Sequence, residues 1–140
     1  MAAALALVLI SRGGGSDDPG PVSLKGSTTR GEPVTLKVVD GRVESFTARI
    51  GVSCPFQRVW HGWDWSAHGP FGGEGKDFEY GDRNRFPEGG RFLSVIRGRL
   101  IGDGTRARGT IDTNGTWPAT GGTRSPCQSS LAFEASKADG

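Results

Sequence analysis

The segment from Arg91 to Thr113 has the pattern of a β-hairpin closed by Asp103-Gly104. An Asp-Gly pair favours a two-residue type I′ turn, because both central residues need positive φ. A turn at this position sets the pairing of every other residue, since side chains alternate between the two faces. One face then carries Ile96, Gly98, Leu100, Ala107, Gly109 and Ile111. Turn chemistry and hydrophobic alternation therefore predict the same register.

Two glycines, Gly98 and Gly109, lie opposite each other in this hairpin. Glycine weakens the interior of a strand and often marks the close approach of another group. The pair therefore predicts the close approach of another backbone or of a bulky ring, and if the tryptophans cover the core, Trp60 or Trp65 is the expected ring.

Alternating apolar residues predict further strands at Val22–Thr28, Pro33–Val39, Arg42–Cys54 and Cys127–Ala135, with shorter candidates at Lys76–Tyr80 and Asn84–Phe86. Asn114-Gly115 is interpreted as a turn. A strict two-residue turn at Asp40-Gly41 would put Phe46 on the face opposite Leu36. We therefore expect either a three-residue turn with Gly41 left-handed, or a bulge between Val43 and Ser45. The sequence predicts one all-β domain over residues 22–136, a small antiparallel meander of six to eight strands, as a barrel or a two-sheet sandwich.

The ends of the chain and its cysteines bear on the compartment. Residues 1–10 form an apolar run that resembles a truncated secretory signal or a short membrane-associating segment, and residues 11–21 have the composition of a flexible linker. Cys54 and Cys127 are the only cysteines. Beside an export-like segment they predict a disulfide and a secreted or cell-envelope location. Two buried free thiols in a cytosolic protein are the alternative.

Several of these segments also resemble a group of small exported bacterial β-proteins of unknown function. The matching runs are GSTTRGEPVTLKVVDGRVESFTARIGVSC, RFLSVIRGRLIGDGTRARGTI and CQSSLAFEA, within Gly26–Ala135. Their shared features are core alternation, turn glycines and the cysteine pair. The resemblance implies a fold, but no enzyme, cofactor or ligand.

The segment from Pro55 to Pro70 concentrates the residues that could bind a ligand. It holds Trp60, Trp63 and Trp65 with His61 and Asp64, and its flanking Gly and Pro residues predict a connection between strands. Indole rings on a loop can stack on sugar rings while nearby polar groups bind hydroxyls, with Tyr80 and Trp117 as expected neighbours. The alternatives are a plug over the end of the core, or contact with a protein partner or a membrane.

The sequence supports an enzymatic activity less well than it supports ligand binding. His61, Asp64 and His68 could ligate zinc in a metal-dependent hydrolase, but their spacing matches no strong zinc signature. The acidic residues between Glu74 and Asp82 could serve glycoside cleavage if two carboxylates lay at the right distance, but such a charge run is expected to form a solvated loop. No motif for a nucleophilic serine, a metalloprotease helix or a nucleotide-binding loop is present, and no cofactor is expected.

The outer face of the hairpin carries Arg97, Arg99, Arg106 and Arg108. These arginines form either an anion-binding patch or a solvated face neutralised by nearby carboxylates. A net charge of only +2 argues against nucleic acid as a partner. The sequence as a whole predicts a monomeric, exported, non-catalytic binding module for a glycan or another envelope component. A structural or partner-docking domain is the alternative.

Overall fold

The computed structural model describes residues 20–55 and 59–138. Almost all of them lie in antiparallel strands: β1 (Val22–Thr28), β2 (Pro33–Val39), β3 (Arg42–Cys54), β4 (Val59–His68), β5 (Asp77–Arg85), β6 (Arg91–Ile101), β7 (Arg106–Pro118) and β8 (Arg124–Lys137). A single 3-10 turn at Thr120–Gly122 joins β7 to β8. No helix in this part of the chain has the length and apolar character needed to span a membrane.

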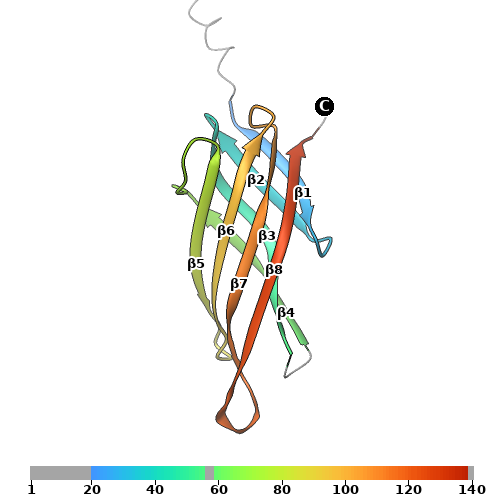
Figure 1. Cartoon of the computed structure of the whole chain (residues 1–140), viewed down its shortest axis with the longest axis vertical. Helices are drawn as coiled ribbons and strands as arrows, with labels where there is room; N and C mark the ends of the chain where they lie inside the picture. Colours follow the sequence, from blue (N-terminus) through green and yellow to red (C-terminus); the bar gives the residue numbers. More distant parts are fainter. Residues whose placement is uncertain (1–19, 56–58, 139–140) are drawn as a thin grey trace, which may run out of the picture.

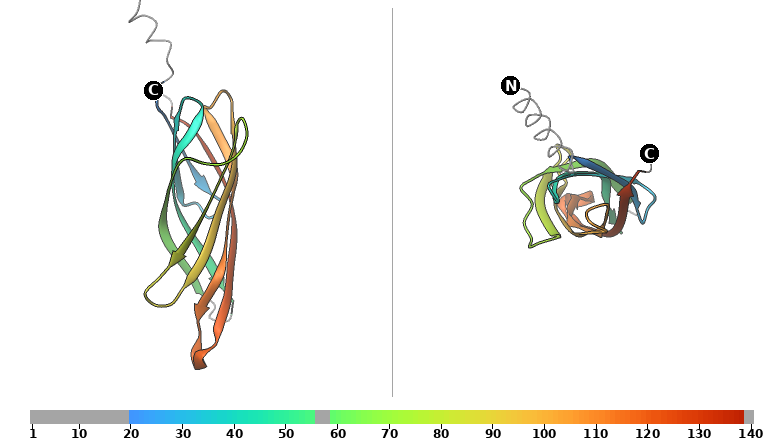
Figure 2. Two further views of the ribbon diagram at one scale, coloured as in Figure 1. Left: turned by 90° about the vertical axis from the view of Figure 1, so that its left-hand side faces the viewer. Right: turned by 90° about the horizontal axis from the view of Figure 1, so that it is seen from above.

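The strands form one rolled sheet in the order β4-β3-β2-β1-β8-β7-β6-β5. Sequence neighbours pair throughout except β4 and β5, and the first strand pairs with the last (Figure 1). An additional pairing of Ser53 with Gln128 joins β3 to β8. It closes a four-strand barrel of β1, β2, β3 and β8. The sheet extends beyond β3 as β4 and beyond β8 as β7, β6 and β5, and it curls on itself when viewed from above (Figure 2). The predicted all-β meander is confirmed, and of the two predicted architectures it is the barrel.

The β6–β7 hairpin has the predicted register. Asp103 and Gly104 both have positive φ, at 58° and 81°, and Thr105 donates its backbone N–H to the Gly102 carbonyl at 3.1 Å. The pairs are Leu100–Ala107, Gly98–Gly109 and Ile96–Ile111. An Asp-Gly turn and one apolar face were therefore sufficient to fix this pairing.

The β2–β3 connection combines a tight turn with a bulge. Val39 pairs with Arg42 across the two-residue turn Asp40-Gly41, so the expectation of a three-residue turn is wrong. The register then shifts, because Val38 pairs with Val43 while the preceding Lys37 pairs with Ser45. The extra residue is the predicted bulge, and it returns Phe46 to the buried face of the sheet.

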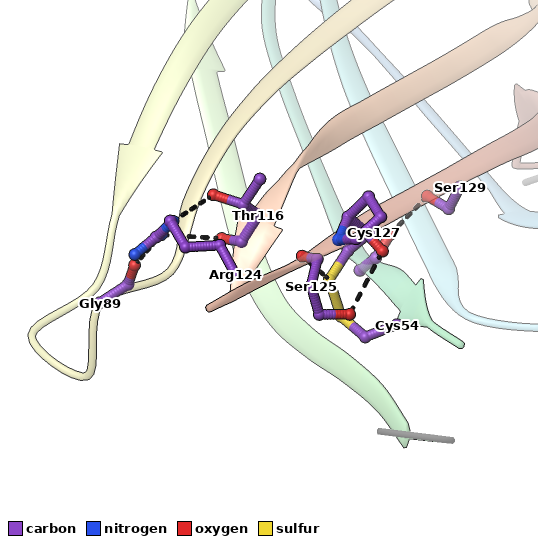
Figure 3. Close-up of a disulfide and its surroundings, with 9 residues drawn as sticks. Cys54, Gly89, Thr116, Arg124, Ser125, Cys127 and Ser129 are labelled. Carbon is purple, nitrogen blue, oxygen red and sulfur yellow. Dashed lines mark hydrogen bonds between the residues drawn. A yellow bond between two sulfur atoms is a disulfide. The ribbon is translucent and has the colours of Figure 1, made fainter. Parts of the chain in front are cut away.

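Besides the core contact of Phe46 with Phe133, three bonded contacts near Cys54 hold β3 against β8. Cys54 and Cys127 form the predicted disulfide, with their Cα atoms 4.3 Å apart. Close to the disulfide, Ser129 donates its hydroxyl to the Gly51 carbonyl (Figure 3). Ser53 also pairs with Gln128. The barrel is therefore closed between β3 and β8 by a covalent bond and a short stretch of pairing rather than by a long ladder.

Inward-facing side chains of all eight strands fill the core. Its largest fully buried members include Leu24, Leu36, Phe46, Ile50, Ile96, Ile111 and Phe133. Phe78, Gly98, Gly109 and Phe133 lie in one row across β5–β8. A Cβ added to Gly98 would lie 2.4 Å from the Phe78 ring, and one added to Gly109 would lie 2.9 Å from the Phe133 ring. The rings against the glycine pair are thus phenylalanines; the expectation of Trp60 or Trp65 is wrong.

Two other expectations are also wrong. Lys76–Tyr80 and Asn84–Phe86 are not separate strands, because β5 runs continuously from Asp77 to Arg85. Asn114-Gly115 forms no turn, since β7 continues through both residues to Pro118. The carboxylates expected in a solvated loop therefore lie mostly on a strand, where Asp77 and Glu79 face arginines of β6.

We predict that removal of the disulfide destabilises the protein by about 4 kcal/mol, because the bond closes a long loop in the unfolded chain. The two cysteines are 73 positions apart in the sequence. Urea unfolding of the oxidised protein and of the Cys54→Ser/Cys127→Ser variant measures the difference. Adding reductant to the double variant should change nothing, and equal stability of the two proteins would contradict the prediction.

We also predict that Gly109→Ala lowers the free energy of unfolding by about 1–3 kcal/mol through overpacking. The added Cβ would lie 2.2 Å from the Arg97 carbonyl oxygen, and this backbone atom cannot move aside cheaply. Gly81→Ala is the matched control inside β5, because its Cβ would make an ordinary 3.6 Å contact with Val95. Denaturant unfolding should therefore rank Gly109→Ala well below Gly81→Ala; the reverse order would refute the steric argument.

Candidate functional site

The tryptophan-rich segment is a strand, not the connection predicted from its flanking Gly and Pro residues. Val59–His68 forms β4 and pairs with β3 along its whole length. Alternation then divides its side chains. His61, Trp63 and Trp65 share one face, while Trp60 and Asp64 lie on the other. The predicted site residues are therefore presented on both faces of a strand at the edge of the sheet.

Trp65 belongs to the core, and the partly buried Tyr80 packs against it. Trp65 is only 3% exposed and packs edge-on against Phe46, with ring centroids 6.1 Å apart. Tyr80 of β5 lies 6.4 Å from the Trp65 ring and 5.2 Å from that of Phe71. These ring contacts join β4 to β5, for which no backbone ladder is formed within the described residues.

The remaining predicted aromatics meet in one cleft, which we call the aromatic cleft. It encloses about 450 Å³ and is lined by Arg49, Trp60, His61, Gly62, Trp63, Phe86, Glu88 and Trp117. These residues come from β3, β4, β7 and the β5–β6 loop. The lining residues place the cleft at the end of the barrel that holds the disulfide. The β5–β6 loop and the β7–β8 hairpin project at this end (Figure 1).

The inner wall of the cleft is a set of mutually packed rings. Trp63 stacks on Phe92 at 5.3 Å and meets Phe86 edge-on at 5.0 Å. Trp117 stacks on His61 at 4.1 Å. A Cβ on Gly90 would lie 2.3 Å from the Trp117 ring, so this glycine allows the β5–β6 loop to lie flat on the indole. The rings are held firmly, and all but Phe92 remain only half-buried.

The outer wall is formed by Trp60. Its ring lies over the paired glycines Gly51 and Gly62, since a Cβ on Gly51 would be 2.7 Å from two atoms of the indole. The guanidinium of Arg30 stacks over the ring, 3.8 Å from its centroid. Arg30 is an exposed residue of the β1–β2 turn. The outer indole is thus already stacked by a planar polar group that can move into solvent.

Polar groups lie on opposite sides of the cleft. Arg49 of β3 pairs with Asp64 at 3.3 Å, and this ion pair is solvent-exposed. Glu88, on the β5–β6 loop, lines the cleft opposite β4. The indole Nε1 of Trp63 is buried and has no acceptor among the described residues. Buried donors are normally satisfied, so this N–H calls for an acceptor from water or from a ligand.

Arg124 fixes the β5–β6 loop that carries Phe86 and Glu88. From β8 its Nε donates to the Thr116 hydroxyl at 2.7 Å, and its Nη2 donates to the carbonyl oxygens of Gly89 and Thr116 (Figure 3). Within the loop, Gly89 donates its N–H to the Phe86 carbonyl at 2.8 Å. Arg124 is therefore a positioning residue for one wall of the cleft.

The proposed metal ligands are not brought together. His61 stacks on Trp117, whereas Asp64 lies on the opposite face of β4 and pairs with Arg49. His68 lies on the face of Asp64 but four residues further along, about 13 Å for an extended strand. Over residues 20–55 and 59–138, no group of three His, Cys, Asp or Glu side chains could hold a metal ion.

The four arginines of the hairpin divide into two pairs. Arg97 contacts Glu79 at 3.2 Å and Asp112 at 4.0 Å, and Arg99 contacts Asp77 at 3.7 Å. Arg106 and Arg108 form no ion pair with any described residue. The part of the arginine face next to β5 is thus neutralised by carboxylates, as one of the two predicted interpretations required.

Sequence reasoning missed Arg49, Phe86 and Glu88 as members of the cleft. Arg49 was missed because an arginine on the outward face of a strand looks like any other solvent-exposed residue in the sequence. The other two are separated from β4 by about twenty residues of chain, and only the strand order brings the β5–β6 loop back beside it. The one available signal was the Pro-Glu-Gly-Gly run at residues 87–90, which marks a loop next to Phe86.

Comparisons with known proteins give no further information on this site. No family model matches the sequence, and no curated protein or solved structure matches it significantly. The functional argument therefore depends on the cleft itself.

We predict that Arg124→Ala loosens the β5–β6 loop and lowers the free energy of unfolding by about 1 kcal/mol, through loss of charge-assisted hydrogen bonds at an exposed site. Amide hydrogen exchange at residues 86–90 should accelerate. Arg42→Ala is the control, because Arg42 is exposed and makes no interaction with other described side chains. Unchanged exchange in the loop of Arg124→Ala would show that this residue does not position the cleft.

Proposed function

We propose that the protein is an exported, non-catalytic binding module that takes a neutral glycan in the aromatic cleft. One observation carries the proposal. Two half-buried tryptophans of β4 and one of β7 border a single cleft, with Arg49 and Glu88 beside them. Apolar ring faces together with hydrogen-bonding groups on both sides match the alternation of C–H surface and hydroxyl groups on a sugar. A volume of about 450 Å³ also falls within the usual range for ligand pockets.

The contrast within β4 argues against a purely structural role for its tryptophans. Trp65, whose indole packs in the core, is only 3% exposed. Trp60 and Trp63 lie on the same strand but stay half-exposed beside a cleft. Retaining partly exposed indoles there, at a cost in hydration free energy, is expected where a ligand completes their burial.

A protein partner is less well supported than a glycan. Val59 is the one large hydrophobic side chain that is clearly exposed among the described residues, at 42%. A broad apolar patch, which often marks a docking surface, is therefore missing from this part of the chain. The concave cleft instead suits a ligand with donors and acceptors of its own. Arg49 can donate to hydroxyl oxygens, and Glu88 can accept from hydroxyl groups.

Binding without catalysis fits the carboxylate content of the cleft. Glycoside hydrolysis commonly uses two carboxyl groups about 5–10 Å apart. Among the described residues that line the cleft, Glu88 is the one carboxylate. The disulfide supports an oxidising compartment, in agreement with the apolar run at residues 1–10. Export to the cell envelope would place the module among polysaccharides.

We predict that the oxidised protein binds a neutral oligosaccharide and that Trp60→Ala and Glu88→Gln each weaken binding about tenfold or more, since few residues dominate an interface. An array of glucan, chitin and mannan fragments identifies the ligand, and isothermal titration calorimetry gives the dissociation constants. Trp65→Phe, a buried change outside the cleft, should leave the dissociation constant unchanged.

Two outcomes would refute the proposal. The first is that none of these oligosaccharides binds the folded, oxidised protein. The second is that Trp60→Ala and Glu88→Gln bind as tightly as the unaltered chain. Near-ultraviolet circular dichroism of each variant shows whether a loss of binding reflects the cleft or a loss of packing.

A further inference from the structure

We propose a second binding site, for a phosphate-type oxyanion, on the outer surface of β1, β8 and β7. A hollow of about 370 Å³ lies there, and its polar and charged lining residues are Lys25, Ser27, Arg106, Arg108, Glu134 and Ser136. We call it the basic hollow. It does not depend on the aromatic cleft, because Arg106 begins β7 whereas Trp117 is near the end of that strand, about 35 Å away for an extended chain.

The strand register places the charged groups in two short rows. In the first row, Ser136 of β8 is flanked by Lys25 of β1 and by Arg106 of β7. Residues directly opposite in antiparallel strands point to the same face, so both cations and the hydroxyl face outward together. Lys25 and Arg106 are thus about 10 Å apart at the backbone, and their long side chains can converge on one small group above Ser136.

The second row adds Arg108 and the one carboxylate of the hollow. Glu134 lies between Ser27 and Arg108 in the register. No ion pair within 4.0 Å joins Arg108 to Glu134, in contrast to Arg97 and Arg99, which are paired with carboxylates of β5 and β7. The hollow therefore has an excess of positive charge, with three cations against one carboxylate.

These cations lack partners inside the described structure. Lys25, Arg106 and Arg108 are exposed, and no carboxylate of residues 20–55 and 59–138 lies within ion-pair distance of them. Arg108 also lies directly opposite Arg99 in the β6–β7 ladder. Like charges placed in this way are destabilising, and a bound anion relieves that repulsion. Arginine forks match the paired oxygens of phosphate, and serine hydroxyls donate to the same oxygens. Tetrahedral oxyanions are the ligand class that fits best.

The site revises the predicted anion-binding patch. The prediction from sequence grouped the four hairpin arginines, whereas the structure separates Arg106 and Arg108 from Arg97 and Arg99 and adds Lys25. Lys25 could not be predicted, because the pairing of the first strand with the last was not evident from the sequence. The arginines of the hollow lie at the start of β7, and Glu134 and Ser136 lie near the end of β8. These strand ends are at the end of the barrel where β1 begins (Figure 1).

The test compares inorganic phosphate with chloride at constant ionic strength, using the full oxidised chain. A thermal-shift titration should show stabilisation by phosphate, since a ligand that binds only the folded state raises its stability. The Arg106→Gln/Arg108→Gln variant should bind phosphate about tenfold more weakly or worse, and Lys25→Gln should also weaken binding. Arg97→Gln/Arg99→Gln is the matched control and should retain the phosphate effect.

The proposal is overturned if phosphate and chloride stabilise the chain equally, or if the control pair loses the effect while Arg106→Gln/Arg108→Gln keeps it. Sedimentation with vesicles of phosphatidylglycerol or phosphatidylcholine then identifies the source of the anion. A lipid headgroup is indicated if the protein sediments with phosphatidylglycerol vesicles but not with phosphatidylcholine vesicles, and if Arg106→Gln/Arg108→Gln abolishes this binding. A phosphate shift without vesicle binding indicates a soluble phosphate or phosphate ester.

Discussion

The contact between β3 and β8 is the constraint on which the rest of this structure depends. These strands are not consecutive in the strand order. One paired position, one serine hydrogen bond and the disulfide join them, beside the core contact of Phe46 with Phe133. The disulfide therefore holds these two strands together, a role that backbone hydrogen-bond ladders fill between the other strands of the barrel. It also sets the start of β4, because Val59 follows Cys54 after only four intervening residues. The aromatic cleft is consequently anchored to a covalent cross-link, although none of its lining residues is a cysteine.

Glycine explains how so many rings fit around a narrow barrel. At Gly98 and Gly109 the missing side chains leave room for Phe78 and Phe133, and at Gly51 the missing side chain leaves room for Trp60. In each case the ring lies against backbone, where a Cβ would overlap it. The high glycine content, 24 of 140 residues, is thus partly a packing requirement and not only a sign of turns.

Sequence reasoning succeeded where a local signal set the geometry and failed where distant strands did. Asp103-Gly104 fixed the β6–β7 register, and the alternation from Cys127 to Ala135 identified the buried face of β8. For β4, aromatic residues on both faces concealed the period of two, so the strand resembled a loop. The local Asn-Gly rule failed at Asn114 because ladders with β6 and β8 hold β7 extended there. Of the residues that line the cleft, the sequence indicated the tryptophans and His61. Phe86 and Glu88 depended on the strand order, and Arg49, an outward-facing residue of β3, gave no functional signal.

The boundary between β4 and β5, which we call the seam, explains the presence of the cleft. A backbone ladder would bring these strands to about 4.8 Å, too close for indole rings to lie between them. Within the described residues no such ladder forms, and ring contacts of Trp65 with Tyr80 and of Trp63 with Phe86 span the seam instead. All three buried polar atoms that lack a partner there, Trp63 Nε1, Trp65 Nε1 and Asn84 Oδ1, belong to these two strands. The unsatisfied hydrogen-bonding capacity of the described barrel thus collects along its unpaired seam, and the cleft opens at one end of it, where a polar ligand or ordered water would satisfy those groups.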